Sequence, residues 1–270
     1  MKKALLIILG LVLAAFVLLP FLWIMATSLK PLGEVSKYPP EWISPHLTLR
    51  PYRDMFFYLP FATYTLNSLL IAFSTMLLTL AIGSLAAFAF ARFQFKGRDL
   101  ILIVFLLSQM LPGASIIIPL FQLMQQVGLY DMRLGLVVVH TALLLPFVIW
   151  LLYGFFQTIP REVEEAALID GCSRLQALRM VILPLALPGL GATALFAFLG
   201  SWNEFFFALL LTSSDSTRTI PVGIGLFVGE YLEVWNQMAA AAVLFSLPPL
   251  LLFLLARKTF VTGLMAGAAK

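Results

Sequence analysis

Six long apolar segments, separated by polar ones, set the pattern of the chain. They cover residues 4–27, 67–91, 100–123, 134–156, 186–211 and 236–256. Each has about 20 residues or more, the length that a helix needs to cross the hydrocarbon core of a membrane. The first is longer than the apolar part of a signal peptide and has no convincing cleavage site, so we expect an uncleaved membrane helix. The pattern therefore predicts an all-α integral membrane protein with six transmembrane helices.

The third apolar segment is interrupted near its middle by Gln109 and by Pro112-Gly113. Backbone groups that proline frees inside lipid must be satisfied by neighbouring helices or by a water-lined cavity. The interruption is therefore either a packing kink or part of a ligand pathway. Residues 30–66 are rich in proline and aromatic residues, which is typical of a loop outside the membrane that lies along its interface.

Composition and charge support this prediction and orient the chain. Hydrophobic residues make up 61% of it and charged residues 11%, against about 25% charged in soluble domains. With the amino terminus inside, eleven of the seventeen Lys and Arg residues fall on the cytosolic side, which favours both termini in the cytosol. We divide the chain into a first transmembrane helix with an outside loop (1–65), a five-helix core (66–256) that contains a charged loop at 158–184, and a basic cytosolic tail (257–270).

The charged loop begins with a predicted short helix. Pro160 suits a first helical position, and carboxylates follow in the first turn, where the helix dipole favours them. These carboxylates are Glu162, Glu164 and Glu165. Val163, Ala166 and Ala167 fall at i, i+3 and i+4, so they form a small apolar face that another protein can approach closely.

A tight turn and a second helix are expected next. Gly171 can adopt a positive φ and end the first helix. Ser173 and Gln176 have the spacing of a capping box, which starts a helix. Pro184 and Pro188 lack amide donors and stand where the next apolar segment begins.

Glu204 is the only acid deep inside an apolar segment, and it follows Trp202 and Asn203. A carboxylate there is unfavourable unless it faces the bundle interior or water. It is either a substrate contact or a carboxylate bonded to a neighbouring helix. Aromatic faces and amide groups suit sugar rings, which present C–H groups on their faces and hydroxyls at their edges.

Four other polar residues lie within or near the spans. Gln109 is a second candidate for the pathway, and Asn67 and Ser68, at the outer end of the second span, are weaker ones. His140 indicates either proton coupling or a hydrogen-bonded structural histidine.

Several chemistries are excluded by missing motifs. The chain has no G-x-x-x-x-G-K-[ST], no H-E-x-x-H and no G-x-S-x-G, and its single cysteine, Cys172, builds neither a disulfide framework nor a metal site. Any ATP hydrolysis must therefore come from a partner. Nothing in the charge pattern indicates a nucleic-acid partner.

The charged loop also contains a spaced motif: Glu165-Ala166-Ala167, three residues, Gly171, nine residues, then Val181-Ile182-Leu183-Pro184. It resembles the EAA motif (E-A-A-x3-G-x9-I-x-L-P) of ABC importer permeases, with Val181 in the usual isoleucine place; the alternative is an ordinary amphipathic connector on the membrane surface. In that family the loop is a coupling helix that docks on a cytosolic ATPase. The coupling residues that the resemblance implies are Glu164, Glu165, Ala166, Ala167, Asp170, Gly171, Leu183 and Pro184.

Further runs extend the resemblance to carbohydrate ABC importer permeases of the maltose type. They are W-N-E-F at 202–205, T-I-P-V-G at 219–223 and F-V-T-G-L at 260–264. The chain departs by ending in M-A-G-A-A-K at 265–270, without a terminal glycine, which leaves the fine contacts of the tail open. The substrate pathway that we expect includes Trp202, Asn203, Glu204, Gln109 and Asn67.

The resemblance implies a type I ABC importer permease fold in the bacterial inner membrane and transport by alternating access. It also implies a second homologous permease subunit, a homodimeric cytosolic ATPase that binds ATP and Mg, and an extracytoplasmic sugar-binding protein. Membrane lipid surrounds the chain, and no cofactor or metal is expected in the chain itself.

Three alternatives stay open. The solute could be a glycerophosphodiester or a polyamine, although an anionic solute would favour Lys or Arg within the spans and none is present. An ion-coupled secondary carrier would use Glu204 and His140 and would usually show internal repeats, of which we find none. An intramembrane enzyme is the third alternative.

Overall fold

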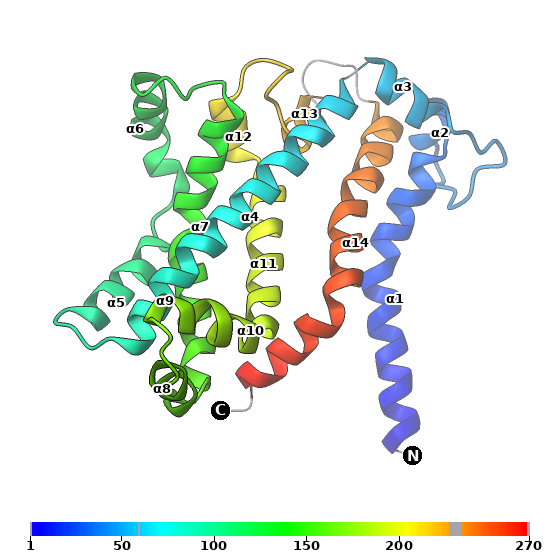
Figure 1. The fold of residues 1–270 in the computed structure, drawn as a ribbon. Coiled ribbons are helices and arrows are strands. Elements are labelled where there is room, and N and C mark those ends of the chain that lie inside the picture. The colour runs from blue at the N-terminus through cyan, green and yellow to red at the C-terminus, as the bar shows by residue number, and fades with distance from the viewer. Residues whose placement is uncertain (1, 59, 227–233, 269–270) are drawn as a thin grey trace. The chain divides into compact units, whose positions relative to one another are not determined.

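The computed structural model describes residues 2–58, 60–226 and 234–268, and this part of the chain contains helices and no strand. The expected all-α fold is confirmed (Figure 1). The elements are, in chain order, α1 (Lys2–Ser28), α2 (Leu32–Val35), α3 (Arg50–Tyr58), α4 (Phe61–Arg92), α5 (Arg98–Ser108), α6 (Gly113–Gln126), α7 (Arg133–Thr158), α8 (Arg161–Ile169), α9 (Arg174–Ala177), the π-helical turn η1 (Leu178–Ile182), α10 (Leu183–Leu185), α11 (Leu187–Trp202), α12 (Phe206–Leu211), α13 (Ile220–Leu226) and α14 (Trp235–Ala268).

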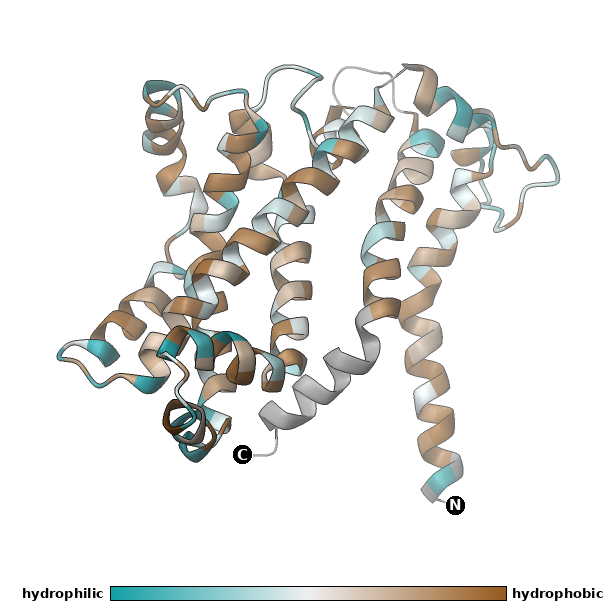
Figure 2. Ribbon diagram, in the orientation of Figure 1, coloured by the Kyte–Doolittle hydropathy of each residue, from teal (hydrophilic) through white to brown (hydrophobic). Residues whose placement is uncertain are grey.

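Within the described residues, four helices are long and apolar enough to cross a membrane alone, and the number rises to six when each of two bent helix pairs counts as one span. The four are α4, α7 and the apolar parts of α1 (Leu5–Ser28) and α14 (Trp235–Leu255), and Figure 2 shows apolar residues along them. Two boundaries differ from the expected ones by more than five residues. α4 begins at Phe61 instead of residue 67, because no helix-breaking residue follows Pro60. α14 continues as a helix to Ala268, into the predicted tail.

The third expected span is two helices that change direction between them. α5 and α6 are bent by 97° across residues 109–112. Pro112 caps α6 in an extended conformation, with φ −65° and ψ 125°, and the residue before a proline is also biased toward extended backbone. The sequence predicts an interruption here; the structure shows a full break instead of a kink.

The fifth expected span is also broken, which the sequence analysis did not predict. α11 ends at Trp202 and α12 begins at Phe206. The carboxylate of Glu204 accepts hydrogen bonds from the amides of Phe207 (2.8 Å) and Ala208 (2.9 Å), and so caps the start of α12. The expected continuous helix over 186–211 is therefore wrong at residues 203–205.

The chain divides into two compact units, which we describe separately: residues 1–65 with 219–248, and residues 66–218 with 249–270. In the first unit, the loop after α1 folds back on that helix. Trp23 packs edge-on against Trp42 of the loop, with ring centroids 4.9 Å apart. Asn236, at the start of α14, donates a hydrogen bond to the carbonyl of Lys30 at 3.0 Å.

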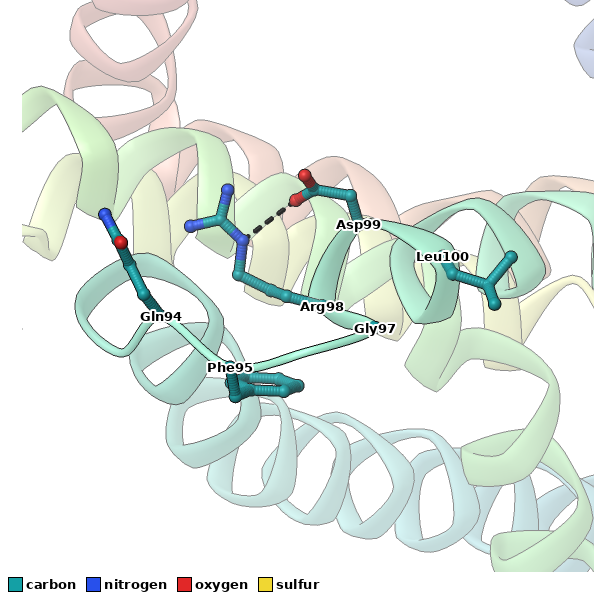
Figure 3. Close-up of a pocket in the computed structure, with 6 residues that line it drawn as sticks. All are labelled: Gln94, Phe95, Gly97, Arg98, Asp99 and Leu100. Atoms are coloured by element: carbon teal, nitrogen blue, oxygen red, sulfur yellow. Dashed lines mark hydrogen bonds and ion pairs between the residues drawn. The ribbon is translucent and has the colours of Figure 1, made fainter.

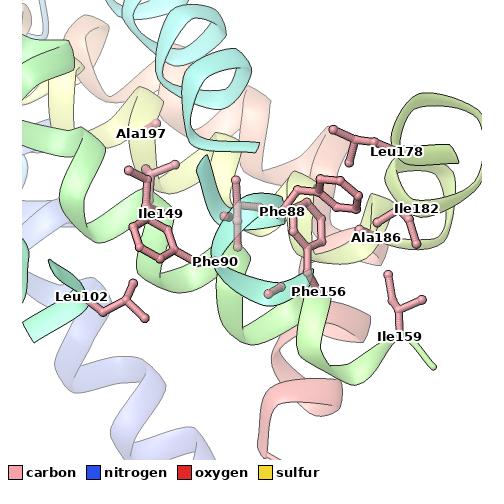
Figure 4. Packing of buried hydrophobic residues seen from close by; sticks show 14 residues of the cluster. Phe88, Phe90, Leu102, Ile149, Phe156, Ile159, Leu178, Ile182, Ala186 and Ala197 are labelled. Atoms are coloured by element: carbon pink, nitrogen blue, oxygen red, sulfur yellow. The ribbon is translucent and has the colours of Figure 1, made fainter. Parts of the chain in front are cut away.

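In the second unit, a buried apolar cluster fills the space where α4, α7, η1 and α11 meet (Figure 4). Phe156 of α7 and Ile182 of η1 are both 0% exposed. α4 approaches α7 closely at Gly83, where a Cβ atom would lie 2.8 Å from Val148 Cγ1. Small residues allow such close packing between membrane helices. The charged loop is thus attached to the same core as α4 and α7.

Candidate functional site

The charged loop folds as helix, turn and helix, as the sequence predicts. α8 begins directly after Pro160, which is its N-cap and not its first helical residue. Gly171 has a φ of +88°. Its amide donates to the carbonyl of Leu168 at 3.1 Å, and the amide of Cys172 donates to that of Ala167 at 3.0 Å. These two bonds form a Schellman cap, which satisfies the last carbonyls of α8.

The second helix starts with the predicted capping box. The amide of Ser173 donates to Gln176 Oε1 at 2.7 Å, and the amide of Gln176 donates to Ser173 Oγ at 3.3 Å. α9 continues into the π-helical turn η1, which the sequence analysis did not predict. π turns are rare and are frequent at functional sites. Here the turn places Leu178 and Ile182 in the buried cluster.

The faces of α8 differ from the predicted ones. Glu164 and Ala167 are buried, 4% and 8% exposed, so the face of the helix that is turned toward the chain's own core carries a carboxylate. Glu165 and Ala166 are exposed, and so is Ile169, at 86%. The surface that α8 leaves free therefore combines a carboxylate, a small residue and a large apolar one.

A buried ion pair explains why Glu164 is turned inward. Arg92 Nε, at the end of α4, lies 2.8 Å from Glu164 Oε2, and the two side chains are 4% and 6% exposed. Arg92 also donates to the carbonyl of Ile159 at 3.0 Å. Arg174 lies 3.6 Å from the other oxygen of Glu164 and stacks over the ring of Phe93, 4.9 Å from its centroid. These contacts join α4, the end of α7, α8 and α9.

The remaining predicted coupling residues lie at the edges of this arrangement. Asp170 is exposed at the end of α8. Leu183 packs on the buried cluster, whereas Pro184 is exposed just before the chain bends by 83° into α11. A cavity of about 550 Å³ opens beside α9 and is lined by Ser173, Leu175, Gln176, Arg179 and Met180. The coupling roles of all eight residues stay predictions.

The loop between α4 and α5 forms a separate pocket of about 400 Å³ (Figure 3). It is lined by Gln94, Phe95, Gly97, Arg98, Asp99 and Leu100. Its ion pair joins Arg98 Nε to Asp99 Oδ1 at 2.8 Å, and the Asp99 side chain is 75% exposed. An exposed pair between neighbouring residues gives no sign of a ligand, and we assign none to this pocket.

The two breaks in the spans meet at α7. At the first break, Gln109 Nε2 donates to the carbonyl of Leu143 at 3.2 Å. At the second, Glu204 Oε2 lies 3.3 Å from His140 Nε2, one turn earlier on the same helix. A Cβ atom on Gly113 would lie 3.5 Å from the Phe207 ring, so α6 also touches α12. Non-helical backbone at membrane depth is tolerated where protein buries it or where it lines a cavity.

Glu204 has well-defined partners. It caps α12, as described above, and approaches His140, whose Nδ1 lies 2.8 Å from Ser201 Oγ in α11. His140 is buried, and the Glu204 side chain is 17% exposed. This is the arrangement expected of a carboxylate bonded to a neighbouring helix. The small exposed part still allows contact with a solute, so the substrate role of Glu204 stays a prediction.

The other pathway candidates lie in different surroundings. Trp202 is 1% exposed and stacks on Phe198, with ring centroids 5.6 Å apart. Asn203 and Gln109 are exposed at the two breaks. Asn67 is 0% exposed. It lies near the start of α4 and donates hydrogen bonds to the loop after α12. In this structure Asn67 thus holds a loop, and its role in the pathway stays a prediction.

The loop of residues 213–218 is held by three side chains from other elements. Asn67 Nδ2 donates to the carbonyls of Ser216 (3.0 Å) and Arg218 (2.8 Å). Arg133 Nη2 also donates to the Ser216 carbonyl, at 3.0 Å. Asp131 accepts hydrogen bonds from the amides of Ser213 and Ser214 and from the Thr217 hydroxyl. Burial alone would raise the pKa of Asp131, but these hydrogen bonds outweigh it and hold the pKa well below its ordinary value.

Sequence reasoning missed Arg92, Ser201 and Asp131. One signal was available for Arg92. It ends a span on the same expected side of the membrane as the carboxylate-rich loop, so an ion pair with one of those carboxylates could have been predicted. For Ser201 the signal was its position one turn before Glu204. Asp131 had none, since the loop that it holds is more than 80 residues away in the chain.

Comparisons with known proteins agree with this architecture. The trehalose/maltose transport system permease protein MalG of Thermococcus litoralis is 38% identical over 100% of this chain and 98% of its own length. The trehalose transport system permease protein SugB of Mycobacterium tuberculosis is 36% identical over 94% of this chain and 93% of its own. The sulfoquinovosyl glycerol transport system permease protein SmoH of Agrobacterium fabrum is 37% identical over 94% and 89%.

A solved bacterial ABC transporter involved in the import of the acidic polysaccharide alginate has the same fold, with a TM-score of 0.79 over 96% of each chain at 22% identity. The family model described as binding-protein-dependent transport system inner membrane component matches residues 79–264, which is more than half of the chain. The expected type I permease fold is thereby confirmed. The chain belongs to the family of binding-protein-dependent transport system inner membrane components.

Proposed function

We propose that this chain is the permease subunit of an ATP-driven importer and forms the translocation pathway for a neutral di- or oligosaccharide of the maltose or trehalose type. The names of the relatives support a sugar or sugar derivative. A neutral solute is supported by the spans themselves, because no Lys or Arg occurs within any of the six apolar segments.

The observation that carries the proposal is the meeting of two broken spans at α7. Interrupted helices near the middle of the membrane are where transporters place their substrates. The exposed amides of Gln109 and Asn203 and the partly exposed Glu204 supply hydrogen-bonding groups there. Such groups match sugar hydroxyls, which both donate and accept hydrogen bonds.

Energy for transport comes from partners. In this proposal α8 docks its exposed surface, with Glu165, Ala166 and Ile169, into a groove on a homodimeric cytosolic ATPase that binds ATP and Mg. A second homologous permease subunit completes the pathway, and an extracytoplasmic binding protein delivers the sugar at the opposite end. Both termini lie in the cytosol, as the excess of Lys and Arg on that side supports. Closure of the ATPase then turns the spans outward, and hydrolysis returns them.

The docking of α8 is tested with charge reversal at two exposed carboxylates, Glu165 and Asp99. Glu165→Lys reverses the charge of an exposed side chain, so the chain should insert normally and lose the ATPase or its coupling. Asp99→Lys makes the same charge change on an exposed residue in the first turn of α5 and should keep both. Insertion and ATPase co-purification are measured on the same samples. If Glu165→Lys retains the ATPase and transports at the unmutated rate, α8 is not the coupling helix.

The solute is tested through the binding protein. Co-purification of that protein, followed by identification of the molecule it holds, is expected to give a neutral oligosaccharide. A glycerophosphodiester or a polyamine would overturn the sugar assignment and leave the importer assignment intact. The ion-coupled carrier is not retained, because transport in this family depends on a binding protein.

A further inference from the structure

α4 is anchored to a different loop at each of its two ends. The helix has no internal proline, and the part from Asn67 to Arg92 lies wholly within one compact unit. These two residues are 25 positions apart, so the rise of an α-helix separates them by about 38 Å, more than the thickness of the hydrocarbon core. α4 therefore connects the two sides of the membrane directly.

At one end, Arg92 holds the charged loop. Its guanidinium pairs with Glu164 of α8 at 2.8 Å and donates to the carbonyl of Ile159, and its side chain is 4% exposed. Arg174 of α9 supports the same carboxylate from the solvent side at 3.6 Å. A buried carboxylate that is separated from its arginine becomes an uncompensated charge, so α8 and the end of α4 are strongly favoured to move together.

At the other end, Asn67 holds the loop of residues 213–218. Its single Nδ2 group donates to two carbonyls, those of Ser216 and Arg218, at 3.0 and 2.8 Å. The side chain is 0% exposed, so water cannot readily replace these bonds. Any displacement of this end of α4 without the loop would leave buried polar groups unpaired. Asp131, just before α7, and Arg133, its first residue, hold the same loop.

We propose that α4 is a strut that transmits displacement between the coupling helix α8 and the loop of residues 213–218, with Arg92 and Asn67 as the positioning residues at its two ends. The proposal rests on the proposed function, because the displacement comes from the ATPase on one side and the binding protein on the other. When the binding protein docks, α4 transmits the displacement of the loop to α8 and so to the ATPase. When the ATPase closes, α4 transmits the displacement of α8 to the loop.

The test uses the complete complex in proteoliposomes, with the ATPase, the second permease subunit and sugar-loaded binding protein. Asn67→Leu keeps the size of the side chain and removes both loop bonds. Its matched control is Thr65→Val, which removes only a hydrogen bond within α4, from Thr65 Oγ1 to the Phe61 carbonyl. ATPase activity is measured with and without the binding protein, and assembly is checked on the same samples.

We expect Asn67→Leu to reduce the stimulation of ATPase activity by the binding protein about 5-fold or more, a common size for coupling between distant sites. Arg92→Met should reduce the stimulation as well, whereas Arg98→Met, at the exposed pair, should not. Because both ends belong to one strut, the double variant Asn67→Leu/Arg92→Met should be no worse than the more impaired single variant. If the loss of stimulation in the double variant equals the product of the losses in the two single variants, the residues act by independent routes and the proposal is overturned.

Two further outcomes are decisive. If the unmutated complex shows no stimulation by any sugar-loaded binding protein, the proposed function fails. If the unmutated complex is stimulated and Asn67→Leu is stimulated equally, the strut fails and the proposed function stands. Should Asn67→Leu not assemble, Asn67→Gln keeps the amide on a longer stem; normal assembly with reduced stimulation supports the strut, and normal stimulation refutes it.

Discussion

Replacing Gly171 is the sharpest test of the loop that joins α8 to α9. The residue has a φ of +88°, which L-residues with a Cβ atom adopt at a cost of about 1–2 kcal/mol. A tight turn between two helices predicts that bulk at this position would also push the helices apart. The structure corrects that expectation, because nothing lies within 4 Å of a Cβ atom built there. The penalty is therefore one of backbone conformation alone.

This reasoning predicts an order of variants. Gly171→Asn should be nearly neutral, since asparagine tolerates the left-handed region. Gly171→Ala should destabilise the closed turn by about 1–2 kcal/mol, which raises the ratio of open to closed turn by a factor of about 5–30. Gly171→Val should destabilise the turn more than Gly171→Ala only because its β-branched side chain restricts the backbone further. The matched control is Gly154→Ala on α7, where a Cβ atom also meets open space but the backbone is helical.

Two measurements on the assembled complex check the order. Hydrogen exchange of the peptide that contains the Gly171 and Cys172 amides reports the opening of the turn directly. Sugar taken up per ATP hydrolysed reports whether the turn matters for coupling. If asparagine is as harmful as valine, or if alanine changes neither measurement, the conformational argument is wrong. A defect in Gly154→Ala of the same size would show that any added methyl group disturbs the complex.

Four other predictions concern separate parts of the chain. Glu204→Ala should reduce uptake in an assembled complex, and Trp202→Ala should in addition lower the thermal stability, since removing a buried tryptophan costs about 3–5 kcal/mol; normal uptake by Glu204→Ala would remove that carboxylate from the pathway. Gly189→Ala places a Cβ atom 2.4 Å from Phe155 Cγ and should lower stability by about 1–3 kcal/mol in a melting experiment, unlike Gly154→Ala. Deleting residues 263–270 should weaken the coupling of ATP hydrolysis to sugar more than insertion, and unchanged sugar-stimulated ATPase activity would show the tail to be dispensable. Because the folded-state pKa of Asp131 is lowered, its stabilisation of the 213–218 loop is present above the ordinary Asp pKa of about 4 and is lost as the pH falls below it; exchange protection of the loop should follow that course, and Asp131→Asn should abolish the dependence.

The sequence predicted those parts of the site whose chemistry is local. The turn at Gly171 and the capping box of Ser173 and Gln176 each need only a few adjacent residues, and both are present. The positions of most spans follow from apolar length alone. The interruption at residues 109–112 was visible because proline and glycine act on their own backbone.

What the sequence did not predict depends on partners distant in the chain or on a second use of the same side chain. Arg92 and Glu164 are 72 positions apart, and the inward turn of α8 follows from their pairing. Glu204 looked like an acid inside a continuous helix, but its carboxylate bonds to the two amides that begin α12. A side chain that substitutes for backbone bonds can end one helix and start another in the middle of an apolar run.

The buried carboxylates indicate which parts of this permease move together. Glu164 lies beside Arg92, and Glu204 lies beside His140. Parting the first pair would leave an uncompensated buried charge, and parting the second would leave a mostly buried carboxylate with fewer partners. We therefore expect α4 to stay with α8, and α7 with α12, throughout the transport cycle. We expect relative motion to concentrate where the chain changes direction, at the 97° break of residues 109–112 and the 83° bend at Ala186. Ala186 lies in the core that carries the charged loop, so we expect a small displacement of α8 to change the angle between spans at that bend.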